Sequence, residues 1–182
     1  MNGTRVFFSH TVAAMFLEAF PPSRYTGLIQ RFRELGLDVE KPLLPAYDYA
    51  IWRQCLEAQR EFVFPRDSPE AAAREQGARY VAAYFSRTPV GGALLVLLRV
   101  IGPRRALERM TRNFRSANNF SDVSVVSTGP KSVTLKVNDV FSARPEYIVG
   151  MLEHGLSLMG TTAHLRVTRQ VGDACEFEAT WE

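Results

Sequence analysis

The chain has 182 residues, of which 46% are hydrophobic and 23% are charged, and its formal net charge is +3. These values are typical of one soluble globular domain with its own core, and they exclude disordered, fibrous and membrane-embedded proteins. The two cysteines, Cys55 and Cys175, lie far apart and match neither a disulfide framework nor a zinc site. We therefore expect a protein of a reducing compartment, located in the cytoplasm.

The first two-thirds of the chain, residues 1–118, is predicted to be mostly helical. Apolar residues recur at helical spacing over 12–20 and 28–35, and the two patterns end at Pro21-Pro22 and at Gly36. The same spacing predicts further helices over 51–62 and 70–85.

The most apolar run of the chain, "TPVGGALLVLLRVIGPRR", begins at Thr88. It is too short to span a bilayer, which takes about 20 apolar residues, so no membrane span is expected. Its adjacent glycines match neither G-x-x-x-x-G-K-[ST] nor G-x-G-x-x-G, so it is not a phosphate-binding loop. Thr88-Pro89 starts and Gly102-Pro103 ends a helix that is apolar nearly all round, which predicts a buried helix.

A basic segment follows this helix and raises the hypothesis of nucleic-acid binding. Its arginines are Arg104, Arg105, Arg109, Arg112 and Arg115. Glu108 interleaves with them and no aromatic residue alternates with them, which favours a solvated helix face. We expect no nucleic-acid partner, and the role of this basic face is left open.

After residue 118 the pattern changes from helices to strands. Apolar and polar residues alternate on both sides of a turn at 128–131, and again on both sides of Gly172-Asp173, so each stretch predicts a hairpin. A helix that begins at Pro145 separates the two hairpins. The predicted fold class is α+β: a single domain, 1–182, whose helical part, 1–118, packs on an antiparallel sheet of about four strands in part 119–182, in the order strand-strand-helix-strand-strand.

No catalytic motif is present, and neither a metal site nor a cofactor is predicted. The sequence lacks G-x-S-x-G, H-E-x-x-H and a Cys/His signature. The three histidines, His10, His154 and His164, have no shared spacing and are expected at the surface or packed as polar tips. A non-enzymatic protein is therefore expected.

Aromatic residues concentrate in the helical part, and such residues line small-molecule pockets as well as ordinary cores. An apolar pocket is predicted beside the buried helix. Arg87, next to the cap of that helix, is expected either to hold an anionic head group or to lie in solvent. Its candidate residues are Tyr49, Trp52, Tyr84, Arg87, Gly91, Leu94, Leu95, Leu98 and Met151.

Several segments together carry a resemblance to one family. They are "VFFSHTVAAMFLEAF", "LGLDVEKPLLPAYDYAIW", "YFSRTPVGGALLVLLRVIGPRRALERM", "PEYIVGMLEHGLSLMG" and "CEFEATW". Their order resembles a myxobacterial paralogous family of domains of unknown function, which implies no catalytic residues. The last third is also similar to ligand-sensing domains of the vinyl-reductase, phenol-sensing regulator, trafficking-subunit and haem-nitric-oxide groups. That similarity implies an enclosed ligand and frequent dimerisation, whereas the cysteine pattern of the metal-binding members is lacking.

The leading hypothesis is a bacterial sensory domain that encloses an apolar or aromatic small molecule between the helix of Leu94 to Leu98 and the C-terminal sheet and helix. One alternative is a ligand-free interaction or dimerisation module, with a second copy or a signalling protein as its partner. Another is a haem-binding sensor, in which one histidine is the axial ligand.

Overall fold

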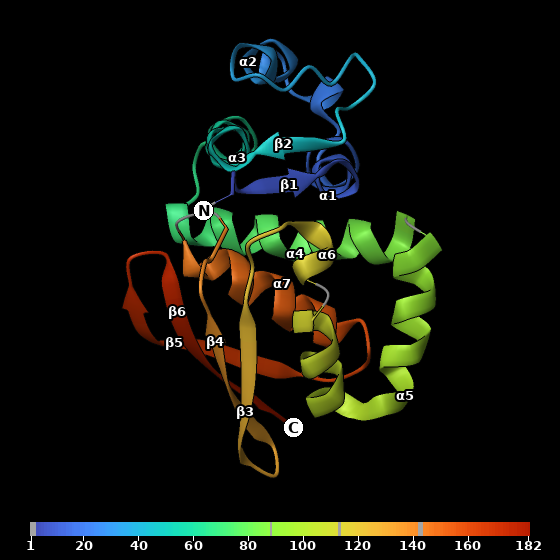
Figure 1. Ribbon diagram of the computed structural model, residues 1–182, viewed down its shortest axis with the longest axis vertical. Helices are drawn as coiled ribbons and strands as arrows, with labels where there is room; N and C mark the ends of the chain where they lie inside the picture. Colours follow the sequence, from blue (N-terminus) through green and yellow to red (C-terminus); the bar gives the residue numbers. More distant parts are fainter. Residues whose placement is uncertain (1–2, 88, 113, 142–143) are drawn as a thin grey trace.

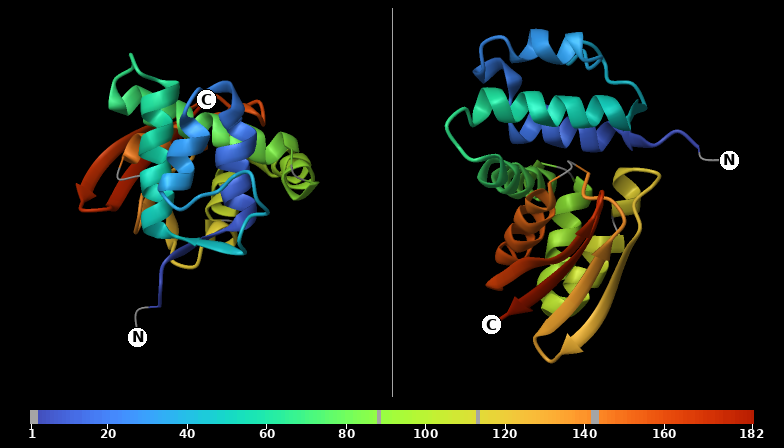
Figure 2. Two further views of the ribbon diagram at one scale, coloured as in Figure 1. Left: turned by 90° about the horizontal axis from the view of Figure 1, so that it is seen from above. Right: turned by 90° about the vertical axis from the view of Figure 1, so that its left-hand side faces the viewer.

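The computed structural model of the chain describes residues 3–87, 89–112, 114–141 and 144–182, and at residues 89–90 and 110–112 it describes the backbone alone. Helix α4 (Pro69–Arg87) crosses the middle of the molecule (Figure 1). A helical layer lies on one side of it, and helix α7 (Pro145–Ser157) with a sheet lies on the other, as Figure 2 shows from the side.

The helical layer contains the first elements of the chain. They are β1 (Val6–Phe8), α1 (Ser9–Ala13), the π-helix η1 (Ala14–Ala19), the 3-10 helix η2 (Pro22–Arg24), α2 (Leu28–Glu34), β2 (Ala46–Asp48) and α3 (Tyr49–Val63). The predicted ends are confirmed: η1 stops before Pro21, and Gly36 leaves α2 with a φ of 95°. Asp48 caps α3 by accepting a 2.7 Å hydrogen bond from the Ala50 amide.

Two features of this layer were not predicted. Strands β1 and β2 pair antiparallel, with Phe7 opposite Tyr47, but three residues are too few to show an alternating pattern. The first predicted helix changes at Ala14 from α to π geometry, and the side-chain amide of Gln59 donates a 3.4 Å hydrogen bond to the Met15 carbonyl inside the π-helix.

The C-terminal sheet confirms the predicted hairpins. Its strands β3 (Val123–Gly129), β4 (Ser132–Val137), β5 (Ala163–Val171) and β6 (Ala174–Trp181) are antiparallel in the order β3-β4-β6-β5. Leu135 faces Phe177 across β4 and β6, and both side chains are buried under the helices. The other face carries ion pairs such as Arg166 with Glu178 at 2.6 Å, so it meets water as expected.

Helix α7 packs against α4 at very short range because both helices have a glycine at the crossing. A Cβ atom added at Gly77 would overlap the Tyr147 carbonyl, and one added at Gly150 would overlap the Arg74 carbonyl. The two glycines therefore set the distance between the helical layer and the sheet layer.

The prediction of a buried helix after Thr88 is wrong, although its predicted end is correct. Helix α5 (Pro89–Arg112) breaks at Gly102, whose φ of 78° and ψ of 162° are not helical. Val96 is 65% exposed and Val100 is 81% exposed, while Leu98 is buried. The helix stands at the side of the molecule (Figure 1), so only one face of its apolar surface is covered. Thr88, the predicted cap, lies outside the described residues.

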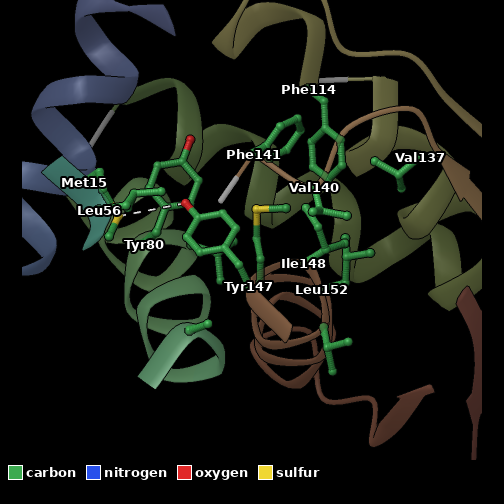
Figure 3. Close-up of a cluster of buried hydrophobic side chains, with 14 of the residues drawn as sticks. Met15, Leu56, Tyr80, Phe114, Val137, Val140, Phe141, Tyr147, Ile148 and Leu152 are labelled. Carbon is green, nitrogen blue, oxygen red and sulfur yellow. Dashed lines mark hydrogen bonds between the residues drawn. The ribbon is translucent and has the colours of Figure 1, made fainter. Parts of the chain in front are cut away.

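The buried side chains form one continuous core that includes both layers. Figure 3 shows a part of it in which Met15, from the helical layer, lies beside Tyr80 and Tyr147, while Val137 from the sheet lies at the other end. Within the described residues, no single helix is long and apolar enough to cross a membrane; α4 and the stretch from Gly91 to Arg109 pass that test only as a pair bent by 104°.

Candidate functional site

A small cavity of about 50 Å³ lies where five helices meet, and its surface is almost entirely apolar. Its wall is formed by α1, α4, α5, α7 and the short helix α6 (Phe114–Ala117). The lining residues are His10, Thr11, Tyr80, Val81, Tyr84, Phe85, Leu94, Phe114, Ser116, Ala117 and Met151. We call this space the helix cavity.

Local sequence spacing explains how α4 contributes the largest share of this wall. Tyr80 and Tyr84 are four residues apart and lie on one helical face, and Val81 and Phe85 continue that face. The glycine contact at Gly77 brings α7 close enough for Met151 to complete the wall.

Apart from the exposed His10, the polar side chains known to line the helix cavity carry hydroxyl groups. Burial raises the pKa of the Tyr80 phenol above its usual value, and the neighbouring Tyr84 raises it further, while a contact with Thr11 acts in the opposite direction. Burial also raises the pKa of Tyr84. Both phenols therefore stay neutral at physiological pH and offer hydrogen bonds without charge.

The Thr11 hydroxyl has unusual surroundings. Thr11 is 1% exposed, and its Oγ1 has no hydrogen-bond partner among the described protein atoms. The Tyr80 hydroxyl is its polar neighbour, yet the geometry of a hydrogen bond is not reached at Thr11 Oγ1. A buried hydroxyl without a partner is rare, because it loses its hydrogen bonds to water.

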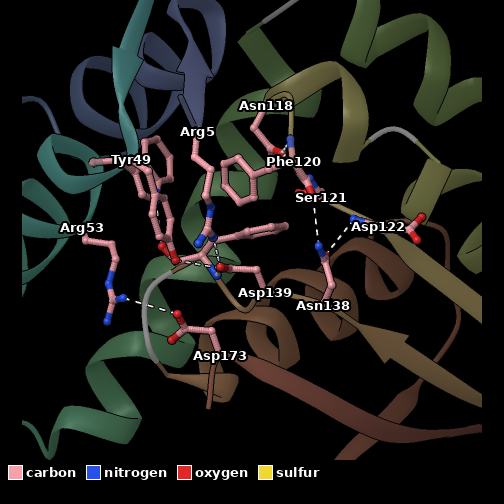
Figure 4. Close-up of polar contacts among 12 residues, drawn as sticks. Arg5, Tyr49, Arg53, Asn118, Phe120, Ser121, Asp122, Asn138, Asp139 and Asp173 are labelled. Carbon is pink, nitrogen blue, oxygen red and sulfur yellow. Dashed lines mark hydrogen bonds and ion pairs between the residues drawn. The ribbon is translucent and has the colours of Figure 1, made fainter. Parts of the chain in front are cut away.

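A polar cluster joins the two layers of the molecule, and we call it the junction (Figure 4). The buried Asp139 pairs with Arg5, accepts a 2.7 Å hydrogen bond from the Tyr49 hydroxyl and accepts another, also 2.7 Å, from the Phe141 amide. The Arg5 guanidinium lies 4.0 Å from the centre of the Tyr49 ring and 4.3 Å from that of Phe120. The junction thus holds β1 and α3 against the loops that flank the sheet.

Three of the predicted pocket residues, Tyr84, Leu94 and Met151, line the helix cavity together. Tyr49 and Trp52 lie elsewhere: Tyr49 belongs to the junction, and the Trp52 ring stacks on Phe7 with centroids 3.9 Å apart.

The remaining predicted pocket residues are also outside the wall. Arg87 pairs with Glu18 at 3.1 Å, Gly91 and Leu98 are buried, and Leu95 is partly buried. The pocket was predicted to lie between α5 and the C-terminal sheet and helix. The residues known to line the helix cavity come from helices, α7 among them, and not from the sheet.

Other lining residues, above all Thr11 and Ser116, were not selected from the sequence. The helical spacing that selected Tyr84 includes Tyr80, so this residue was within reach of the sequence argument. Thr11 and Ser116 carry no such signal, because they come from segments about a hundred positions apart in the chain that meet only in the fold.

The other chemistry-bearing residues do not assemble into a site. Within the ranges that the structure describes, no group of three or more His, Cys, Asp or Glu side chains is placed to hold a metal ion. Cys55 and Cys175 are free and buried, and burial raises the pKa of Cys55 to about 12. His10 lines the helix cavity but is exposed, and its ring stacks on Phe8 with centroids 6.2 Å apart.

The amino-acid sequence matches the model of one protein family over nearly its whole length. A model described as a protein of unknown function (DUF2378) matches residues 5–182. The chain belongs to this family. The resemblance to a family of unknown function is therefore confirmed, and the myxobacterial origin stays a prediction. No curated protein matches the chain in sequence.

Solved structures share the fold of this DUF2378 chain. One, from work on haem redox potential and protein-induced porphyrin distortion, has a TM-score of 0.67 and 8% identity and covers 95% of this chain and 92% of its own. An Fe(II) unliganded H-NOX protein from K. algicida has a TM-score of 0.61 and 12% identity, with 86% and 87% covered. An H-NOX protein from S. oneidensis in the Fe(II)NO ligation state has a TM-score of 0.63 and 8% identity, with 95% and 96% covered. The similarity to haem-nitric-oxide domains is thus confirmed for the fold.

Proposed function

We propose that this chain is a non-catalytic sensory domain that binds a small apolar molecule in the helix cavity, as a component of bacterial signalling in the cytoplasm. The observation that carries the proposal is an apolar cavity of about 50 Å³ lined by five helices. The fold shared with H-NOX structures supports it, and the two free, buried cysteines suit a reducing compartment.

The volume of the cavity limits the ligand that it holds in this conformation. A cavity of about 150 Å³ takes benzene, so a space of about 50 Å³ takes a molecule of roughly two or three non-hydrogen atoms. At a ceiling of about 1.5 kcal/mol per atom, such a ligand binds with a dissociation constant of about a millimolar at best. A larger or tighter ligand requires one wall to move.

Helix α5 is the wall best suited to move. Leu94 lines the cavity, while Val96 and Val100 on the same helix are mostly exposed. The break at Gly102 separates this segment from the rest of the helix. An outward shift of α5 enlarges the helix cavity, which α4 and α7 also line, and it changes the surface of the molecule when a ligand binds.

Xenon and a library of small apolar compounds test this proposal. We expect xenon to shift the backbone amide resonances of the cavity residues and library ligands to raise the melting temperature. Leu94→Phe fills the cavity and removes both responses, whereas Val96→Phe, on the exposed face of the same helix, leaves them unchanged. Absence of any response in the unsubstituted protein, or an equal response in Leu94→Phe, contradicts the proposal.

A haem-binding sensor is the alternative that the fold favours, but the residues of this structure do not fit a haem. The cavity is several-fold smaller than the roughly 300 Å³ at which small-molecule pockets begin. His10, the histidine known to be in the wall, is exposed and stacked on Phe8. We expect haemin to keep its free absorption spectrum when it is mixed with the protein. A shifted spectrum that is lost in His10→Ala is the result that favours haem.

The exposed apolar face of α5 favours a second candidate function, dimerisation with another copy of the chain. Val96, Leu97 and Val100 are 65%, 42% and 81% exposed and lie on one side of the helix. Light scattering at micromolar concentration is expected to give the mass of a dimer, and Val100→Glu is expected to give a monomer. A monomer before the substitution excludes this candidate.

A further inference from the structure

We propose that the helix cavity selects molecules with an apolar body and a single hydroxyl or carbonyl oxygen, which pairs with Thr11 Oγ1. This inference rests on the proposed function and adds the chemical class of the ligand. Two independent observations carry it: the apolar surface of the cavity, and the buried hydroxyl of Thr11 that has no hydrogen-bond partner among the described protein atoms.

Thr11 is a buried polar residue in a mostly apolar wall, to which Tyr80, Tyr84 and Ser116 also bring hydroxyl groups. Thr11 comes from α1 and lines the cavity together with Leu94 of α5 and Met151 of α7. The phenol of Tyr80 lies beside it, and burial holds that phenol neutral. A charged ligand would lose its hydrating water here and would gain no oppositely charged partner. The cavity therefore excludes ions.

A hydroxyl group donates one hydrogen bond and accepts others, so Thr11 can bind either of two ligand groups. It donates to a carbonyl oxygen, or it accepts from a ligand hydroxyl. In both cases the ligand supplies the bond that Thr11 lacks in the protein. A hydrocarbon of the same size fills the same space but leaves the Thr11 hydroxyl unpaired.

Ethanol and propane provide a matched pair of probes, because each has three non-hydrogen atoms. Their affinities are measured by amide shift titrations of the unsubstituted protein, Thr11→Val and Thr11→Ser. Thr11→Val keeps the shape of the side chain and removes the hydroxyl, while Thr11→Ser keeps the hydroxyl. We expect the ratio of ethanol to propane affinity to fall about five- to tenfold in Thr11→Val and to stay within about twofold in Thr11→Ser.

Thermal unfolding without ligand gives a second readout. Thr11→Val removes an unpaired buried hydroxyl, so its melting temperature is expected to equal or exceed that of the unsubstituted protein. A clear fall in the melting temperature of Thr11→Val, with Thr11→Ser unaffected, shows that the hydroxyl is paired inside the protein and overturns the inference.

The titrations separate failure of the inference from failure of the proposed function. If both probes bind and their affinity ratio is the same in Thr11→Val, the cavity binds small molecules without selection by Thr11, and only the inference is overturned. If neither probe shifts the amides of the cavity residues in the unsubstituted protein, the proposed function fails and the inference fails with it.

Discussion

At the level of single residues, Asp139 connects the two layers. Its carboxylate is buried, pairs with the part-exposed Arg5 and accepts hydrogen bonds from the Tyr49 hydroxyl and the Phe141 amide. Phe141 has a φ of 64°, which is unusual for a residue with a side chain, and the bond from its amide to Asp139 holds that conformation. A buried charge of this kind is stable only while its partners are present.

Asp139→Ala is expected to lower the free energy of unfolding by about 3 kcal/mol, because it leaves the Phe141 amide and the Tyr49 hydroxyl without their acceptor. The exposed pair of Arg53 and Asp173, 3.6 Å apart, supplies the matched control. Asp173→Ala is expected to cost less than about 1 kcal/mol. Chemical denaturation measures both, and equal losses would show that the junction does not hold the layers together.

The buried thiols predict how stability depends on alkaline pH. Burial raises the pKa of Cys55 to about 12 and that of Cys175 to about 11, from an ordinary value of 9.0. The folded state therefore favours the neutral thiols. Their contribution to stability is complete below about pH 9 and is lost as the pH rises through 11 and 12. The buried tyrosines, whose pKa values are also raised, act in the same direction.

We accordingly expect the melting temperature to fall above about pH 9, and to fall less steeply in Cys55→Ala. Neither thiol is expected to react with a thiol reagent at pH 7 while the protein is folded. Rapid labelling of Cys55 under native conditions would contradict its burial.

At the level of the elements, the crossing of α4 and α7 determines the spacing of the layers. Gly77 and Gly150 allow backbone to touch backbone, and Tyr147 and Met151 reach the core only at that distance. Any side chain at either glycine must push the helices apart, which opens the core on both sides of the contact.

Gly77→Ala and Gly150→Ala are each expected to destabilise the fold by about 3 kcal/mol or more. Gly92→Ala, in α5, is the control, because a Cβ atom there makes only an ordinary contact 3.8 Å from the Phe85 carbonyl. This variant is expected to be as stable as the unsubstituted protein, or more stable by up to about 1 kcal/mol from helix propensity. Calorimetry distinguishes the outcomes, and a loss in Gly92→Ala as large as in Gly77→Ala would contradict this account.

At the level of the whole molecule, one core connects the helical layer with the sheet layer. The two tryptophans report on the two parts separately, because Trp52 lies in α3 and Trp181 lies in β6. Both side chains are buried and belong to the same core. The layers are therefore expected to unfold together.

Trp52→Phe and Trp181→Phe each leave one fluorescent reporter. In each variant, the fluorescence transition is expected to coincide with the loss of helical circular dichroism, as in a two-state protein. A Trp181 signal that melts apart from the helical signal would show that the sheet layer folds as an independent unit.

The sequence predicted much of the fold because local signals are strong in this chain. Prolines and glycines end the helices where expected, and both hairpins have alternating residues around a turn. The helix cavity was predicted less well. Tyr84, Leu94 and Met151 were selected, but Thr11 was not, because nothing in its neighbourhood distinguishes a threonine at a cavity from one in a core.

Taken alone, the sequence determined the order, the type and most ends of the elements, since these depend on residues a few positions apart. The tertiary structure alone decided which apolar faces are covered. The stretch from Gly91 to Ile101 is apolar nearly all round, with Arg99 as its one charged residue, and its hydropathy is the same whether a neighbour covers one face or all of them. Coverage depends on contacts between distant segments, and those contacts leave Val96 and Val100 exposed and place Thr11 at the cavity.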